Sequence, residues 1–298
     1  MRAQLTLMLM TTALLMGVAE AQTLRERWRA EAGASASALP GGQTMAYGKD
    51  GLQTIRFWPG KGKAAPLVIF VHGGGWKRGS KENATGAAKV AHYTGLGYAF
   101  ASIDYRLVPD AMVEEQAQDV ADALAYLRSH AGQLGVDPGR IVLMGHSAGA
   151  HLVALVGTDM RYFAKAGLGP DAIRGVVALD GAAYDVGQQM AQAGRFMGAT
   201  YAQAFGTEPG RQQTLSPALQ ASAPNAPDFL ILHVDRTDGT AQAQALADAL
   251  KAGGTAARVE ALEGRGLRGH MQINRSMGDP AYPGTGIVDA YLARVFAQ

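Results

Sequence analysis

A serine stands at the centre of a Gly-x-Ser-x-Gly pattern, GHSAG at residues 145–149. The apolar run Ile141–Met144 precedes it, and a segment that favours helix follows it. A tight turn from a strand into a helix requires glycine two residues before and two residues after the serine, and such a turn projects the hydroxyl above the edge of a sheet. The pattern therefore predicts a nucleophile at Ser147.

A second glycine-rich segment, HGGGW at residues 72–76, directly follows the apolar run Leu67–Val71. Three glycines in a row let backbone N–H groups face a cavity with no Cβ atom in the way, which is how an oxyanion hole is built. A phosphate-binding loop would require a Gly-Lys-Ser/Thr ending, which is absent. Trp76 is predicted to form a wall of the substrate pocket, and packing in the core is the alternative. The N–H groups expected to bind an oxyanion are those of Gly74, Gly75 and Ala148.

A serine hydroxyl needs a base, and that base needs an acid to orient it. The chain has seven histidines. We predict His270 as the base, because it ends a glycine-rich segment, residues 264–270, that follows the last expected strand and is expected to be a loop able to reach the serine. The other six lie in the two motifs or on expected helices and strands: His72, His92, His130, His146, His151 and His233.

The acid is expected in the loop after the apolar run Phe229–Val234, which carries two aspartates. Counting from the end of the expected strand favours Asp238, whereas counting back from the helix that follows favours Asp235. We predict Asp238. Asp180, which follows the preceding expected strand, is a third candidate.

Short apolar runs alternate with helical patterns from Leu67 onward, which predicts a doubly wound, mostly parallel α/β sheet with right-handed crossovers. Ligands bind such sheets beyond the carboxyl ends of the strands, where the serine is expected. Residues 44–47 and 52–58 are expected to add an antiparallel pair. Residues 181–227 interrupt the alternation and predict a small helical lid over the site, with a surface excursion that has its own core as the alternative. The main expected strands are 67–71, 98–105, 141–144, 176–179, 229–234 and 257–262, and the main expected helices are 85–95, 113–130, 151–156, 241–251 and 286–296.

The N-terminus has the pattern of a secretory signal peptide: Arg2, an apolar stretch over Leu5–Val18 and an Ala-x-Ala site at residues 19–21. Cleavage before Gln22 would leave a single large domain at residues 22–298. A membrane anchor is the alternative, although the apolar stretch is shorter than the ~20 residues that a spanning helix needs.

Composition excludes several classes of function. The chain has no cysteine, which excludes disulfides and thiolate chemistry and suits an oxidising compartment. Its formal net charge is +2, with no dense basic stripe, so a nucleic-acid partner is not expected. No group of acidic and histidine residues has the spacing of metal ligands, so neither a metal nor another cofactor is expected.

Three segments together resemble a known family: HGGGW at 72–76, DYRLVP at 104–109 and GHSAGAHL at 145–152. In this order and spacing they are similar to α/β-hydrolases of the esterase/lipase group. The first and third are closer to the feruloyl-esterase-like and arylformamidase-like branch than to the hormone-sensitive-lipase branch, which usually has an acidic residue before the serine. Gly75 departs from arylformamidases, which commonly carry tyrosine there.

The resemblance covers about residues 45 to 297 and implies an α/β-hydrolase fold with a structural ion pair between Asp104 and Arg106. It implies a serine esterase that acts on small or aryl carboxylic esters. The signal-peptide pattern adds the expectation that the protein is periplasmic or secreted and that, once the signal peptide is removed, it has no membrane partner. An arylformamidase-type amidase is the alternative enzyme, and a hydrolase-fold binding protein without catalysis is the alternative of another class. The residues that would carry the reaction are Ser147, His270 and Asp238, with the N–H groups of Gly74, Gly75 and Ala148.

Overall fold

The computed structural model describes residues 41–82 and 85–298. The predicted signal peptide at residues 1–21 lies outside these ranges. Within them, no helix combines the length and the apolar character needed to cross a membrane.

The described chain forms one eight-stranded sheet in the order β1-β2-β4-β3-β5-β6-β7-β8. The first two strands are antiparallel to each other, β2 is antiparallel to β4, and all other pairs are parallel, as the sequence predicts. The central strands are buried on both faces, which explains their continuous apolar sequences. The strands are β1 (Gln43–Ala46), β2 (Thr54–Trp58), β3 (Ala65–Val71), β4 (Ala99–Ile103), β5 (Val136–His146), β6 (Gly175–Leu179), β7 (Asp228–Asp235) and β8 (Ala256–Arg265).

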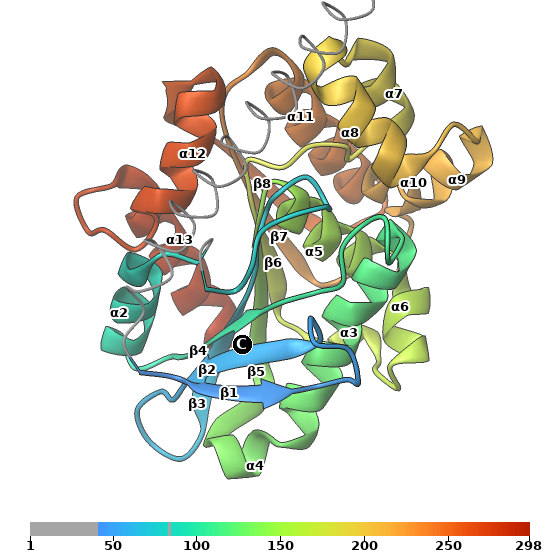
Figure 1. Ribbon diagram of the computed structural model, residues 1–298. Helices are drawn as coiled ribbons and strands as arrows, with labels where there is room; N and C mark the ends of the chain where they lie inside the picture. Colours follow the sequence, from blue (N-terminus) through green and yellow to red (C-terminus); the bar gives the residue numbers. More distant parts are fainter. Residues whose placement is uncertain (1–40, 83–84) are drawn as a thin grey trace, which may run out of the picture. The chain divides into compact units, whose positions relative to one another are not determined.

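Helices cover both faces of the sheet (Figure 1): α2 and α13 lie on one side, and α3, α5 and α6 lie on the other. All eleven residues of α5 are buried, so this helix forms the centre of its layer. The main helices of the two layers are α2 (Ala87–Gly95), α3 (Val113–Ser129), α5 (Ala148–Thr158), α6 (Met160–Lys165), α11 (Thr237–Ala252) and α13 (Pro283–Phe296), and the short segments α4 (Ala131–Leu134) and η1 (Pro170–Ala172) join them to the strands.

The segment between β6 and β7 is helical, as predicted for residues 181–227. Figure 1 shows α7 and α8 above the upper end of the sheet, the end at which β5, β6 and β7 finish. The insertion consists of α7 (Val186–Gln192), α8 (Arg195–Phe205), α9 (Pro209–Thr214) and α10 (Pro217–Gln220).

Two boundaries differ from the prediction at positions that matter for the site. β7 continues to Asp235 and α11 already begins at Thr237, so Asp238 lies in the first turn of a helix rather than in a loop. β8 continues to Arg265 and is followed at once by α12 (Gly266–Ser276), so His270 lies on a helix and not in the predicted loop.

Candidate active site

Ser147 lies at the turn between β5 and α5 with φ 56° and ψ −118°, a conformation that non-glycine residues rarely adopt. A Cβ atom at Gly145 would lie 2.2 Å from the backbone oxygen of Gly149, and a Cβ atom at Gly149 would lie 2.1 Å from the backbone oxygen of Val71. Both glycines are therefore required for close packing at the turn, which confirms the reason given for the Gly-x-Ser-x-Gly pattern. The Ser147 N–H donates to the Leu179 carbonyl of β6 at 3.0 Å and holds the turn against the neighbouring strand.

The structure brings Ser147 and His270 together, as predicted. The Nε2 atom of His270 lies 3.0 Å from the Ser147 Oγ atom. The Nδ1 atom of the same ring lies 2.5 Å from Oδ2 of Asp180. A carboxylate can only accept, so Nδ1 carries a proton and Nε2 is left free to accept the serine proton. This is the arrangement of nucleophile, base and orienting acid.

The carboxylate beside His270 belongs to Asp180, the third candidate, and the prediction of Asp238 is corrected here. Asp180 directly follows β6, its side chain is fully buried, and its Oδ1 accepts the Val234 N–H at 3.1 Å. Asp238 instead accepts a hydrogen bond from Gln189 at 3.0 Å, and Asp235 pairs with the exposed Arg265 at 2.7 Å. Because α11 starts two residues after β7 ends, Asp238 is carried away from the histidine into the helix.

Strained backbone conformations gather at this site. Among the described residues, those other than glycine with positive φ are Trp76, Ser147, Asp180 and Ala183. One is the serine at the turn and one is the buried acid. Ala183 follows the acid in the sequence, and Trp76 ends the HGGGW segment. Such conformations cost of order 1–3 kcal/mol each and persist where the surroundings impose them, often at functional sites.

The HGGGW segment lies against the turn. A Cβ atom at Gly73 would lie 2.8 Å from the His146 backbone oxygen and 3.0 Å from Cβ of Ser147. Gly74 has φ 128°, and a Cβ atom there would lie 1.9 Å from the Arg78 backbone oxygen, so only glycine fits. Gly73 thus packs against the serine turn, and the sequence-predicted oxyanion residues Gly74 and Gly75 directly follow it.

The side chains around this turn hold its backbone in place. Nδ1 of His72 lies 2.7 Å from the Gly73 carbonyl oxygen, and the Tyr105 hydroxyl donates to the His72 carbonyl at 2.9 Å. The rings of His72 and Tyr105 stack at 4.3 Å. The histidine of HGGGW is therefore a residue that shapes the loop, in keeping with its exclusion as the base.

Trp76 is placed in the core, which corrects the prediction that it contacts substrate. Its side chain is buried, and its ring packs edge-on against Phe205 of α8 with centroids 4.7 Å apart. Its Nε1–H donates to Nδ1 of His151 at 3.3 Å, and Nε2 of His151 donates to the Leu215 carbonyl at 2.9 Å. Burial lowers the pKa of His151 to about 4, so the ring stays neutral and can accept from the tryptophan. Trp76 ties the glycine turn to the helical insertion.

His146, the residue before the serine, fixes the backbone of the base. Its Nε2 lies 2.9 Å from the His270 carbonyl oxygen, and the two rings lie 4.6 Å apart. Burial, with a smaller contribution from the neighbouring His270, holds the pKa of His146 well below its usual value. A neutral His146 can therefore donate to this carbonyl without adding a charge beside the base.

Asp104 and Arg106 do not pair with each other as expected. Asp104 bonds to Nζ of Lys81 at 2.7 Å, and Arg106 bonds to the buried Asp119 of α3 at 2.8 Å. Both are structural, as the resemblance implies. Asp104 fastens the segment after the glycine turn, and Arg106 fastens the end of β4 to a helix.

A cavity of about 570 Å³ opens between the insertion and the turns that follow β7 and β8, and its lining does not include Ser147, His270 or Asp180. Arg236 forms part of its wall and also approaches Asp180, with Nε 2.9 Å from Oδ2. The lining is mixed, with amide, charged, aromatic and apolar groups. Its residues include Gln189, Met197, Tyr201, Arg236, Thr237 and Asp238.

Lys89 of α2 is fully buried below α12, the helix that carries His270. Its Nζ donates to the Thr85 carbonyl at 2.8 Å and to the Asn274 carbonyl of α12, and it lies 5.0 Å from the Phe70 ring centre. None of the ion pairs in the described chain includes Lys89. Burial alone lowers its pKa to about 7.

This shift predicts a pH-dependent stability. An unfolded lysine has a pKa of about 10.4, so between pH 7 and 10 the unfolded chain binds one proton more than the folded chain, and stability rises with pH. Wild type is expected to gain about 1.4 kcal/mol relative to Lys89→Met for each pH unit above 7. Urea unfolding of both proteins at pH 7 and pH 9 measures the difference. A difference that stays constant would show that Lys89 has the same charge state in both forms of the chain.

The fold and the site together define a class. A mostly parallel eight-stranded sheet, a serine at the turn from β5 into α5, and a histidine after the last strand are the features of the α/β-hydrolase fold. A family model described as BD-FAE matches residues 55–250, and the chain belongs to this family.

Individual relatives agree with this assignment. The chain is 32% identical over 201 residues to "Esterase LipC" of Mycobacterium tuberculosis, a match that covers 64% of this chain and 49% of the relative. It is 35% identical over 113 residues to "Carboxylesterase NlhH" of the same organism, covering 37% of this chain and 35% of the relative. The chain thus spans about half, or less, of the length of these curated relatives.

Solved structures share the fold. Esterase B from Lactobacillus rhamnosis matches with a TM-score of 0.73 at 21% identity and 94% coverage of both chains. Est2, a thermophilic esterase from Thermogutta terrifontis, matches with a TM-score of 0.67 at 23% identity, covering 87% of this chain and 94% of that one. At these identities the likeness concerns the fold alone.

Proposed function

We propose that this protein is a carboxylic ester hydrolase that forms an acyl-enzyme on Ser147. The observation that carries the proposal is the His270 ring, which bonds through Nε2 to the serine and through Nδ1 to the buried Asp180. The names of the relatives, an esterase and a carboxylesterase, support the same reaction.

In the proposed first step, Oγ of Ser147 attacks the ester carbonyl carbon while Nε2 of His270 takes the hydroxyl proton. The carbonyl oxygen becomes an oxyanion, which the N–H groups of Gly74, Gly75 and Ala148 are proposed to bind. Ala148 is the first residue of α5, where N–H groups have no partner within the helix and the helix dipole favours negative charge. Asp180 stabilises the imidazolium that forms.

Collapse of the tetrahedral intermediate breaks the bond to the leaving alkoxide oxygen, which takes the proton from Nε2 and departs as the alcohol. Water then gives a proton to His270 and attacks the acyl-enzyme carbonyl. Return of that proton to the Ser147 oxygen releases the carboxylic acid and restores the serine hydroxyl. Each proton that His270 takes is returned within the cycle, so no cofactor is consumed.

We expect a preference for short acyl groups of about two to six carbons. In a fitted apolar pocket each further buried methylene contributes ~0.8 kcal/mol, so a site for long chains improves steadily with chain length. The insertion at residues 181–227, which is expected to cover the site, is rich in alanine and glutamine and has few large apolar side chains that could line a long channel. Values of kcat/KM on p-nitrophenyl esters of graded length, with N-formylkynurenine and a feruloyl ester alongside, test this. A kcat/KM that still rises through the C10 and C12 esters would contradict it, and hydrolysis of the formamide in preference to the esters would identify an amidase.

Export is the second part of the proposal, supported by the signal-peptide pattern at residues 1–21. We infer a periplasmic or secreted protein with a mature N-terminus at Gln22. Expression of the full chain in a bacterium followed by N-terminal sequencing of the exported fraction measures this. Retention in the cytosol with residues 1–21 intact would contradict it.

A further inference from the structure

Asp180 has a second partner besides His270, and this partner is a charged arginine. Arg236, the residue between β7 and α11, places Nε 2.9 Å from Oδ2 of Asp180, the same oxygen that lies 2.5 Å from Nδ1 of His270. Nε of Arg236 and Nδ1 of His270 contact the same oxygen atom, so the arginine charge lies close to the histidine ring. The Asp180 carboxylate is fully buried, and the Arg236 side chain is 15% exposed.

Two further contacts hold the Arg236 guanidinium beside Asp180. Its Nη2 donates to the Gly181 carbonyl at 2.9 Å, and its Nη1 lies 3.9 Å from Oδ1 of Asp238. The contact between Nε and Asp180 is short but poorly aligned for a hydrogen bond. Arg236 therefore acts on the acid through its charge more than through a directed hydrogen bond.

We propose that Arg236 is a positioning residue that shares Asp180 with His270 and thereby sets the pH range in which His270 is a free base. A buried carboxylate needs a countercharge while the histidine is neutral, and Arg236 supplies it. The same positive charge opposes protonation of His270 and keeps the ring free to accept the serine proton at lower pH. This inference rests on the proposed function for its kinetic test.

The other charged groups near His270 do not supply this countercharge to Asp180. His146 is held neutral by its burial, and Lys89 contacts a carbonyl of α12 and not Asp180. Tyr184 and Tyr282 both lie near Asp180, whose charge adds to burial in raising the pKa of each hydroxyl, so both are neutral. The titratable and charged groups near His270 include Asp180, Tyr184, Arg236, His146, Lys89 and Tyr282, with Arg268 and Arg275 on α12 itself. The strands that pack against α12 carry Asp228, His233 and Asp235 on β7 and Arg258, Glu260, Glu263 and Arg265 on β8.

The test measures the acidic limb of the pH profile of kcat/KM in the Arg236→Gln variant. Without the charge, His270 takes up a proton more readily, so the acidic midpoint of the kcat/KM profile moves to higher pH, by about one unit for charges this close. Arg236→Lys keeps the charge and is expected to stay close to wild type. Because Lys89 titrates near neutrality, the Arg236→Gln comparison is repeated in the Lys89→Met background, where the same upward shift is expected.

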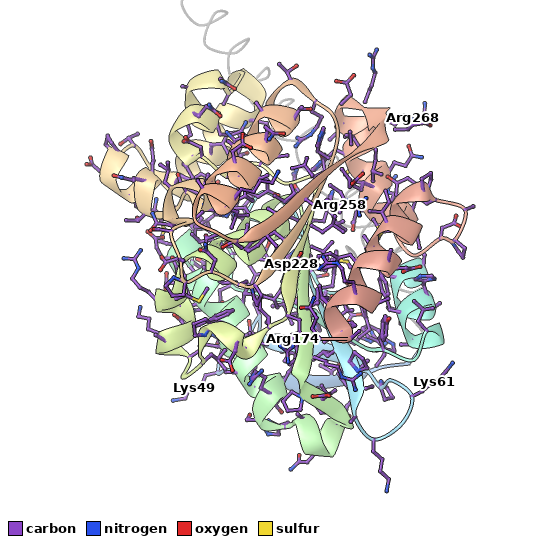
Figure 2. All side chains as sticks on the ribbon, turned by 180° about the vertical axis from the view of Figure 1, so that it is seen from behind. Lys49, Lys61, Arg174, Asp228, Arg258 and Arg268 are labelled. Atoms are coloured by element: carbon purple, nitrogen blue, oxygen red, sulfur yellow. The ribbon has the colours of Figure 1, made fainter. Side chains whose placement is uncertain are left out.

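Arg258→Gln is the matched control, because it also removes one arginine charge. Arg258 lies on β8, 61% exposed and paired with Glu260, and Figure 2 shows it on the outermost strand. No shift is expected there, since solvent screens an exposed charge.

NMR titration of the His270 imidazole measures the pH midpoint of its protonation directly and does not require catalytic activity. If wild type does not hydrolyse esters, the proposed function fails while this titration still decides the role of Arg236. An upward shift in Arg236→Gln that Arg236→Lys restores supports the proposal, and Arg236→Met replaces the glutamine variant if the latter does not fold. No shift, or the same shift in the glutamine and lysine variants, overturns it.

Discussion

Replacement of Ser147 with alanine is expected to lower kcat for ester hydrolysis about 10⁴- to 10⁶-fold, because no other group on the turn can form the acyl-enzyme. Replacement of His270 with alanine is expected to have an effect of the same size, since the serine hydroxyl then has no base. The two residues act as a unit, so the double variant is expected to be scarcely worse than either single variant. Initial rates on p-nitrophenyl acetate measure all three.

Ser129→Ala is the matched control, because Ser129 is exposed at the end of α3 and its hydroxyl bonds to the Tyr126 carbonyl and the His130 ring of the same segment. Its activity should equal that of wild type. Thermal unfolding of each variant shows whether the chain is folded. If a folded His270→Ala protein kept more than about a tenth of the activity, the assignment of the base would be wrong.

Asp180→Asn is expected to lower kcat by about 10⁴-fold with little change in KM. The amide can donate to Nδ1 of His270, which favours the ring tautomer with the proton on Nε2, and that atom can then no longer accept from Ser147. The asparagine has nearly the same size as the aspartate, so the contact with the Val234 N–H can persist. Steady-state kinetics of the folded variant measure both constants.

Asp238→Asn and Asp235→Asn are the controls for this assignment. Asp238 bonds to Gln189, and Asp235 pairs with an exposed arginine at the rim, so each change should lower kcat by less than about tenfold. A larger loss in Asp238→Asn than in Asp180→Asn would return the role of the acid to Asp238.

The serine and the histidine could be predicted because their signals are local. The tight turn at Ser147 requires glycines at fixed spacing, and His270 is the first histidine after the last strand. The insertion at residues 181–227 could also be predicted as helical, because it breaks the alternation of strands and helices. The parallel sheet follows from short apolar runs that must be buried on both faces.

The acid could not be assigned in this way, because its identity depends on which strand end faces the histidine. β6 pairs directly with β5, the strand that carries the serine, whereas β7 lies one strand further away. Asp180 directly follows β6 and so lies at the carboxyl edge of the sheet, where ligands bind. The sequence favours the two aspartates after β7 because it predicts that the helix begins at residue 241, whereas α11 begins at Thr237.

The contacts of Trp76 could not be predicted from the sequence either. Its place after the glycine turn is visible in the sequence, but its burial depends on Phe205 of α8, a residue far along the chain. The hydrophobic periodicity of the sequence cannot predict a contact between residues so far apart in the chain. The partners of Asp104 and Arg106, Lys81 and Asp119, are likewise set by tertiary structure.

The most direct test of the central claim is mass spectrometry of the protein after reaction with a fluorophosphonate, which labels activated serines. The proposed mechanism predicts one adduct per chain, located on the peptide that contains Ser147, with loss of esterase activity in step with labelling. Ser147→Ala should take up no label. Esterase activity that survives complete labelling of Ser147, or an adduct on another residue that accounts for the loss of activity, would contradict the assignment of Ser147 as the nucleophile.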